Sequence, residues 1–306
     1  MEMIRTYTRE KLTWVDLEKP TREEIRDIIS MYGIDPVTGE ELLLPSIQPR
    51  VEIFRDYLYV VLYFPASRHT NDNNPLQEID FVIGKNYLLT VRYDTVDAVH
   101  KFGKEFEVDS ILEKSSLGSH AGFIFHSLVK KLYKSVQHEL DFLSSAPGEI
   151  EKNIFSGNEK EMVFELSKLS RELLHFKRSL APHKEMLESF MLASPTFFGE
   201  TFKAKAEDLL FAYERVLLGV SLRVELLNEL RTTNDSILTT KQNQTLRLFS
   251  AISFITFPLA LIVAILGLRA EGTPLVDHPN GFIIIGGGVA GIALLMFAYF
   301  EKKHWL

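Results

Sequence analysis

The chain has 306 residues, which allows one large domain or two smaller ones, and it has no cysteine, which excludes disulfides, thiolate metal sites and cysteine nucleophiles. Its formal charge of −7 argues against a protein that neutralises nucleic-acid phosphates, so we expect no nucleic-acid partner. The sequence contains no phosphate-binding loop, no close cluster of histidines and carboxylates and no nucleophile elbow, so it does not indicate an enzyme.

Residues 1–118 have the pattern of a mixed α/β domain. Thr13–Leu17 is predicted to be a strand, and Thr21–Tyr32 is predicted to be an amphipathic helix that begins with a capping box of Thr21 and Glu24. Polar turns separate four β-rich segments and predict two hairpins; the segments are Arg50–Phe54, Tyr57–Phe64, Ile79–Gly84 and Tyr87–Arg92.

Residues 119–195 change to a helical period and predict a helical hairpin. Pro147 and the glycine after it interrupt the first helix. The second helix is expected from about Asn158 to Met191, with a bend at Pro182. Pro195 is expected to start the last segment of the chain.

The segment from about residue 201 to residue 268 contains one proline, Pro258, and therefore predicts a single helix of about 100 Å. We assign residues 196–247 to a stalk and residues 248–268 to a first membrane span. A helix of this length without internal caps is typical of a coiled coil or of a stalk that enters a membrane.

Residues 248–268 and 281–300 carry no charge, and each is long enough to cross a hydrocarbon core of about 30 Å. The alternative is a pair of buried helices in a soluble protein, but two such segments side by side favour a membrane hairpin. The polar linker, residues 269–280, then lies outside the membrane. Basic residues flank the two spans on the side opposite the linker, so both termini, including the tail 301–306, are expected in the cytoplasm. The chain is thus predicted to be a multi-pass protein of the inner membrane, with the lipid bilayer as a partner.

One face of the first span alternates polar and apolar side chains at steps of three or four residues: Asn243, Leu246, Ser250, Ser253, Phe257, Ala260 and Ala264. In a symmetric oligomer this face could line an axial channel, where the polar groups replace ion hydration and the Leu and Phe side chains gate by dewetting. The alternative is ordinary packing between membrane helices, for which Ser and Ala are also typical. The spacing alone leaves both interpretations open.

Short motifs are spread along the chain in a defined order: Trp14–Leu17, Gly39–Leu43, Gln48–Glu52, Gly84–Val91, Lys241–Gln244, Phe257–Leu259 and Lys302–Leu306. Together with the terminal hairpin, their order and spacing resemble the CorA family of divalent metal-ion transporters over nearly the full length. The resemblance implies an α+β cytoplasmic domain, a long stalk helix and two C-terminal transmembrane helices in a funnel-shaped homopentamer, with the first span lining the pore.

The resemblance also implies that Mg²⁺ is both a transported ion and a feedback signal bound between subunits, with no other cofactor. An alignment without gaps places Asp208 on a family interface carboxylate and Glu41 on its partner. Oxygen ligands of this kind suit Mg²⁺. Without the resemblance, these two carboxylates would be interpreted as solvated surface.

The mouth of the first span departs from the family pattern. The family has a Gly-Met-Asn signature there, whereas this chain has Gly267, Leu268 and Arg269. Arg269 carries a permanent positive charge and no acceptor, so it cannot receive a hydrated cation as Asn does. A salt bridge to Glu271 or Asp277 is one interpretation, and a mouth that favours anions or does not conduct is the other.

The leading hypothesis is passive transport of divalent metal cations, with Mg²⁺ first and Zn²⁺, Co²⁺ or Ni²⁺ next. The alternative is a divergent CorA-like paralogue that lacks the selectivity signature and acts as a membrane sensor or passes other ions.

Overall fold

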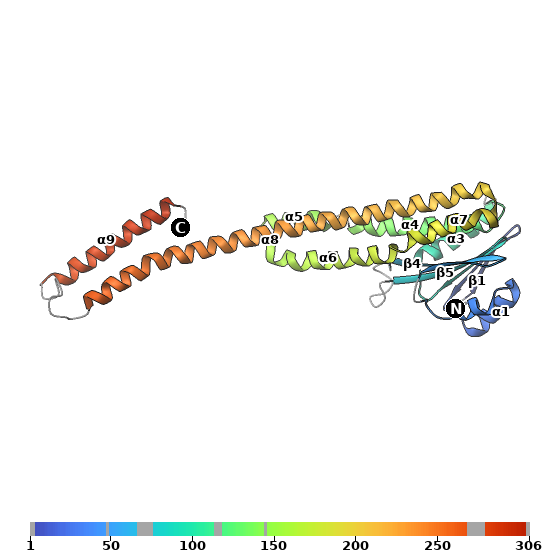
Figure 1. The fold of residues 1–306 in the computed structure, drawn as a ribbon, viewed down its shortest axis with the longest axis horizontal. Helices are drawn as coiled ribbons and strands as arrows, with labels where there is room; N and C mark the ends of the chain where they lie inside the picture. Colours follow the sequence, from blue (N-terminus) through green and yellow to red (C-terminus); the bar gives the residue numbers. More distant parts are fainter. Residues whose placement is uncertain are drawn as a thin grey trace.

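The computed structural model describes residues 4–46, 49–65, 76–112, 118–143, 146–267 and 279–303. An α/β unit lies at one end, a helical bundle packs against it, and one very long helix leaves the bundle and runs beside the last helix at the far end (Figure 1). This arrangement confirms the expected α+β domain, the stalk helix and the C-terminal pair of apolar helices.

The six strands are β1 (Ile4–Arg9), β2 (Leu12–Glu18), β3 (Arg50–Ile53), β4 (Tyr57–Pro65), β5 (Leu76–Gly84) and β6 (Tyr87–Arg92). The helices before the stalk are α1 (Arg22–Tyr32), α2 (Pro36–Glu41), α3 (Asp97–Leu112), α4 (Gly122–Phe142), α5 (Ala146–Phe155), α6 (Glu159–Leu180) and α7 (His183–Phe198). A short 3-10 turn, η2 (Glu200–Phe202), leads into α8 (Lys203–Gly267), and α9 (Gly281–Lys302) follows.

The strands form one sheet in the order β1-β2-β6-β5-β4-β3, in which β2 and β6 pair in parallel and the other neighbours pair antiparallel. Each face of the sheet carries its own hydrophobic core. On one face, α1 contributes Ile25 and Ile28 to the smaller core. On the other face, α3 and the α4–α8 bundle form the larger core.

The predicted capping box of α1 is confirmed, since the Thr21 and Glu24 side chains each accept a backbone N–H of the other. The four β-rich segments and both hairpins are also confirmed. The strand β1 and the helices α2 and α3 were not predicted. In β1, half-buried and exposed residues alternate without a fully buried position, so its sequence carries a weak strand signal.

The expected start of the last segment at Pro195 is wrong, because Pro195 lies inside α7. Proline removes the N–H that would bond to the carbonyl of Met191. The Ser194 hydroxyl donates to that carbonyl at 3.2 Å, so the helix continues. It ends at Gly199, whose positive φ of 87° is a conformation that glycine adopts without strain.

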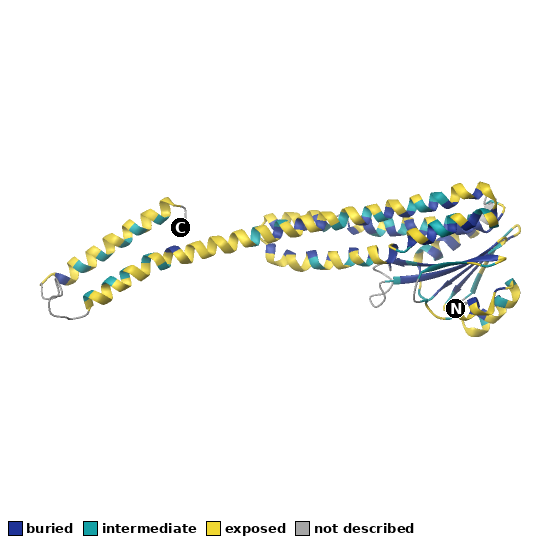
Figure 2. Cartoon of the chain, in the orientation of Figure 1, coloured by how far each residue is buried: buried dark blue, intermediate teal, exposed yellow. Residues whose placement is uncertain are grey.

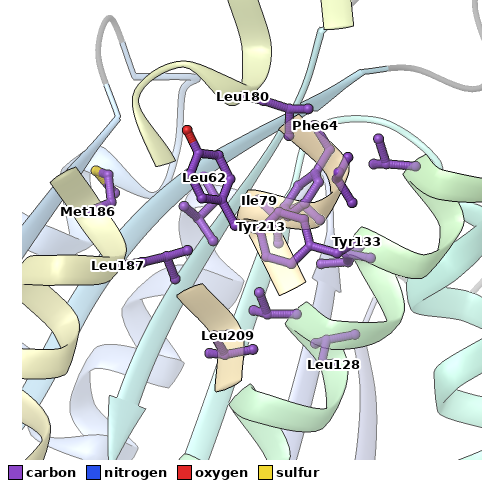
Figure 3. Packing of buried hydrophobic residues seen from close by; sticks show 14 of the residues in the cluster. Leu62, Phe64, Ile79, Leu128, Tyr133, Leu180, Met186, Leu187, Leu209 and Tyr213 are labelled. Atoms are coloured by element: carbon purple, nitrogen blue, oxygen red, sulfur yellow. The ribbon is translucent and has the colours of Figure 1, made fainter. Parts of the chain in front are cut away.

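The helical bundle is fastened to the sheet through a fully buried histidine at the start of α7. His183 Nδ1 lies 2.8 Å from the Tyr133 hydroxyl, and its Nε2 lies 2.7 Å from the Tyr63 carbonyl oxygen of β4. Burial lowers the pKa of His183 to about 4, so the ring is neutral. Figure 3 places Tyr133 and Tyr213 in the same packed cluster as Phe64.

The long helix predicted from residue 201 to residue 268 is observed as α8, which is continuous through Pro258. Its first half packs in the bundle, whereas most of its second half and of α9 is exposed in the single chain (Figure 2). Both segments are apolar and long enough to cross a membrane.

Candidate functional site

The two C-terminal helices contact each other along one stripe on each. In α9 the partly covered residues recur at steps of three or four: Ile285, Val289, Ala293, Met296 and Phe300. The covered residues of α8 have the same spacing: Ala251, which is fully buried, and the half-buried Ile255, Leu259, Ile262 and Leu266. The rings of Phe254 and Phe300 are 6.3 Å apart and close the contact at the end nearer the C-terminus of the chain.

The predicted pore face of α8 lies on the side that α9 does not cover. Successive residues of a helix are about 100° apart, so a stripe through Ser250, Phe257 and Ala264 faces away from the stripe of Ala251 and Leu259. Six residues of the predicted face are exposed and one, Ser253, is half-buried; the exposed six are Asn243, Leu246, Ser250, Phe257, Ala260 and Ala264. The face is therefore free to meet other copies of the helix.

This uncovered face offers oxygen atoms between bulky apolar side chains. The Ser253 hydroxyl donates its proton to the Phe249 carbonyl at 2.8 Å, which leaves the lone pairs of its oxygen available to a cation. Phe257, which is 73% exposed, and Leu246 are the bulky groups of the stripe. A helix face on which polar residues alternate with bulky apolar residues suits a pore that conducts ions and is gated by hydrophobic constrictions.

At the C-terminal end of this face, Gly267 is the last residue of α8. Leu268, Arg269, Glu271 and Asp277 lie outside the described residues. The predicted role of Arg269 therefore stays a prediction from the sequence.

Asp208, one of the two predicted metal carboxylates, lies near the start of α8 and faces α4. Its Oδ2 lies 2.6 Å from the Lys130 ammonium and 2.8 Å from His126 Nε2. The hydrogen bond from Lys130, with help from His126, holds the pKa of Asp208 below its ordinary value. The carboxylate therefore already has a cationic partner within the chain.

Glu41, the other predicted carboxylate, is the last residue of α2. It forms an ion pair with Arg50 of β3, and Arg50 also lies 2.6 Å from Glu52. Glu41 belongs to the face of the sheet that α1 covers, whereas Asp208 belongs to the bundle on the other face. The structure does not bring the two together within one chain, and their pairing across neighbouring subunits stays a prediction.

A buried acidic pair that the sequence reasoning missed lies on β5. Asp80 Oδ2 accepts hydrogen bonds from the hydroxyls of Tyr59 and Tyr93, both at 3.1 Å, and Glu78 Oε1 accepts the Ser46 N–H at 2.7 Å. The remaining oxygens, Asp80 Oδ1 and Glu78 Oε2, are buried without a partner. Burial, reinforced by the Glu78 carboxyl, raises the pKa of Asp80 well above its ordinary value. The signal in the sequence was the alternation Glu78-Ile79-Asp80, which places two carboxyls on one face of a buried strand.

A basic groove between α4 and α8 was also not predicted. Its volume is about 490 Å³, and its lining is His126, Ser127, Lys130, Lys131, Tyr133, Lys134, Gln137, Ala212, Arg215 and Val216. Within the described ranges, no three His, Asp or Glu side chains lie close enough together to hold a metal ion. These two features, the acidic pair and the groove, are separate from the buried ion pair of Arg92 with Asp16, in which both charges are compensated within the sheet.

Comparisons with known proteins agree over almost the whole chain. The sequence model of the family described as CorA-like Mg²⁺ transporter protein matches residues 9–303. The cobalt/magnesium transport protein CorA of Thermotoga maritima is 22% identical over 297 residues, which are 96% of this chain and 83% of that protein. The cobalt/magnesium transport protein CorA of Methanocaldococcus jannaschii is 22% identical over 303 residues, which are 97% of this chain and 92% of that protein.

A solved structure has the same fold. The complete structure of the CorA magnesium transporter from Methanocaldococcus jannaschii matches with a TM-score of 0.84 at 20% sequence identity, and the match covers 98% of this chain and 93% of that chain.

Proposed function

Because the chain belongs to the family of CorA-like Mg²⁺ transporter proteins, we propose that it forms a homopentameric membrane channel or transporter that passes divalent cations. Mg²⁺ is the first candidate ion, and Zn²⁺, Co²⁺ and Ni²⁺ follow. The observation that carries the proposal is the uncovered stripe of α8, which lies opposite α9 and alternates polar with bulky apolar residues. The names of the relatives from Thermotoga maritima and Methanocaldococcus jannaschii, both cobalt/magnesium transport proteins, support the choice of ion.

The proposal is tested by ion flux into liposomes that contain the purified full-length protein. Mg²⁺, Zn²⁺, protons and chloride are each offered from outside with a matching fluorescent reporter inside. We expect Mg²⁺ to enter faster than chloride or protons. If no divalent ion enters while protein incorporation is normal, transport of divalent cations is overturned.

The second candidate is a divergent paralogue that senses ions at the membrane or passes other ions. The replacement of the family's Asn by Arg269 favours it, because a ring of arginines repels cations. Chloride flux above divalent flux in the same liposomes would support this candidate.

In a chain that also carries Arg269→Asn, so that the charge at the mouth no longer limits entry, Phe257→Ala is expected to raise divalent flux a further several-fold. Phe257 is exposed on the proposed pore face, and removing its ring widens an apolar constriction and reduces the cost of wetting it. The matched control is Phe254→Ala, since Phe254 lies one turn away and packs against Phe300 of α9. Equal changes in both variants would indicate a general loosening of the helix pair and contradict a gate at Phe257.

Both ends of the membrane hairpin are expected to face the cytoplasm. The chain has no cysteine, so single cysteines introduced at Asp277 and at Leu306 can be labelled without background. A membrane-impermeant maleimide should label Asp277→Cys in intact cells and Leu306→Cys only after the cells are opened. Labelling of both positions from outside would contradict the predicted topology.

A further inference from the structure

The basic groove between α4 and α8 has an excess of positive charge that the chain itself does not compensate. Lys130 pairs with Asp208 at 2.6 Å, and Lys131 pairs with Glu105 at 2.6 Å. No ion pair of Lys134 or Arg215 occurs in the part of the chain that the structure describes. The groove is thus net positive in a chain with a formal charge of −7.

The floor of the groove is apolar, and its edge continues into an apolar stripe of α8. Ala212 and Val216 belong to the lining. On the neighbouring side of the same helix, Phe211, Leu218 and Leu222 are 63%, 60% and 56% exposed. Large apolar side chains in a row on an exposed helix are typical of a surface that another protein covers.

This stripe runs in register with the proposed pore face further along α8. Asn243 lies 21 residues and Ser250 lies 28 residues beyond Leu222, so the three residues share one position of a seven-residue repeat along α8. An assembly that brings the pore faces to a common axis therefore also brings the stripe, and the groove at its edge, against a neighbouring copy.

The chain carries an acidic surface that complements the groove. Residues 22–56, which include α1, α2 and β3, contain eight acidic and four basic residues, a net charge of −4. Among the acidic side chains, Glu23 and Glu40 are exposed, and Glu40 pairs only with an exposed Arg22 among the described residues. More than half of the formal charge of the chain thus lies in this short segment.

We propose that the groove between α4 and α8 docks the acidic α1–α2 edge of a neighbouring copy of the chain, and that this contact holds without a divalent cation. Lys134 and Arg215 meet the neighbour's carboxylates, while Lys130 keeps Asp208 neutralised. The apolar floor and the α8 stripe supply buried area, and the charges fix which surfaces meet. The inference rests on the homo-oligomer of the proposed function and specifies one of its contacts.

The test uses the full-length protein in detergent and measures its mass by light scattering after size-exclusion chromatography, across a series of NaCl concentrations. The groove variant is Lys134→Glu with Arg215→Glu. The matched control is Lys177→Glu with Arg178→Glu, two exposed residues at the end of α6. We expect association of the groove variant to be weaker by about tenfold or more, because like charges then face each other across the contact, while the control keeps the wild-type mass.

Two further measurements distinguish the proposed contact from misfolding of the variant and from a contact bridged by a metal ion. Adding Glu23→Lys and Glu40→Lys to the groove variant should restore the wild-type mass, which a variant that merely misfolds would not do. Adding EDTA to the wild type should leave its mass unchanged. Loss of the wild-type oligomer in EDTA and its return with Mg²⁺ would overturn the inference, and so would a groove variant as salt-resistant as the control. A wild type that is monomeric at every salt concentration would overturn the proposed homopentamer itself.

Discussion

Arg269→Asn is expected to raise the flux of Mg²⁺ more than tenfold in liposomes, with a smaller gain for K⁺. The substitution removes one positive charge per subunit at the outer end of the first span and restores an acceptor at the position where the family has Asn. The gain depends on ion charge, because the repulsion between a fixed charge and an ion doubles when the charge of the ion doubles.

The expected size of the effect follows from Coulomb's law. Five arginine charges at roughly 7 Å from a divalent ion repel it by about 6 kcal/mol at the dielectric constant of water, before screening by salt. A monovalent ion meets about half of that barrier. Screening reduces both numbers, but the ratio between the two ions remains.

The matched control is Arg269→Lys, which keeps the charge and changes the shape, and it should leave Mg²⁺ flux near the wild-type value. If Arg269 is instead held in a salt bridge by Glu271 or Asp277, neutralising it leaves a net negative mouth, and K⁺ flux should rise along with Mg²⁺ flux. Unchanged flux of both ions would place the limiting barrier deeper, at Leu246 or Phe257. A wild type that already carries Mg²⁺ at the rate of Arg269→Asn would contradict the electrostatic argument.

The elements that sequence reasoning identified are those with a strong periodic or capping signal. The capping box of α1, the alternating strands and the uncharged helices depend on neighbours in the sequence, so their patterns are visible there. The wrong prediction that a new segment starts at Pro195 also has a local cause, which is a side-chain hydrogen bond. The Ser194 hydroxyl replaces the missing backbone donor, and a rule that treats every proline as a boundary does not include such compensation.

The charged sites were less predictable, because their partners are distant in the sequence. Asp208 meets Lys130 across 78 positions of the chain, and Asp80 shares a site with Tyr59 from another strand. Without the fold, Asp208 is simply a carboxylate on a helix, and only the resemblance to the family singled it out. The groove and the buried acidic pair require the packing of α4 on α8 and of β5 beside β4 and β6.

Asp80→Asn is expected to make the protein more stable than the wild type at pH 8 and to leave its stability nearly unchanged at pH 4. The Asp80 and Glu78 carboxyls each have one oxygen that is buried without a partner, and one proton shared between these oxygens would satisfy both. An asparagine imitates the protonated form, since its amide donates to Glu78 while its oxygen accepts from Tyr59 and Tyr93.

The sign of the pH dependence follows from the raised pKa of Asp80 in the folded state. An unfolded chain releases this proton near pH 4, whereas the folded chain retains it to higher pH. Above pH 4 the folded state therefore binds more protons than the unfolded state, and its free energy of unfolding falls as the pH rises, by up to about 1.4 kcal/mol per pH unit. The free energy of unfolding stops falling at the pH where the folded pair of carboxyls loses its proton. The Asp80→Asn variant does not show this fall.

Thermal unfolding of the full-length protein, with Trp305 replaced by Phe in every variant so that the fluorescence comes from Trp14 in the core of the sheet, gives the measurement at pH 4, 6 and 8. The control is Asp56→Asn, which changes an exposed carboxyl in the turn between β3 and β4. The difference in melting temperature between Asp80→Asn and the wild type should grow steadily with pH, and that of the control should stay constant. An Asp80→Asn variant that melts below the wild type at pH 8 would mean that Asp80 is ionised in the folded state. The unpartnered oxygens would then require a bound cation rather than a proton, because two adjacent buried carboxylates repel each other strongly when both are charged.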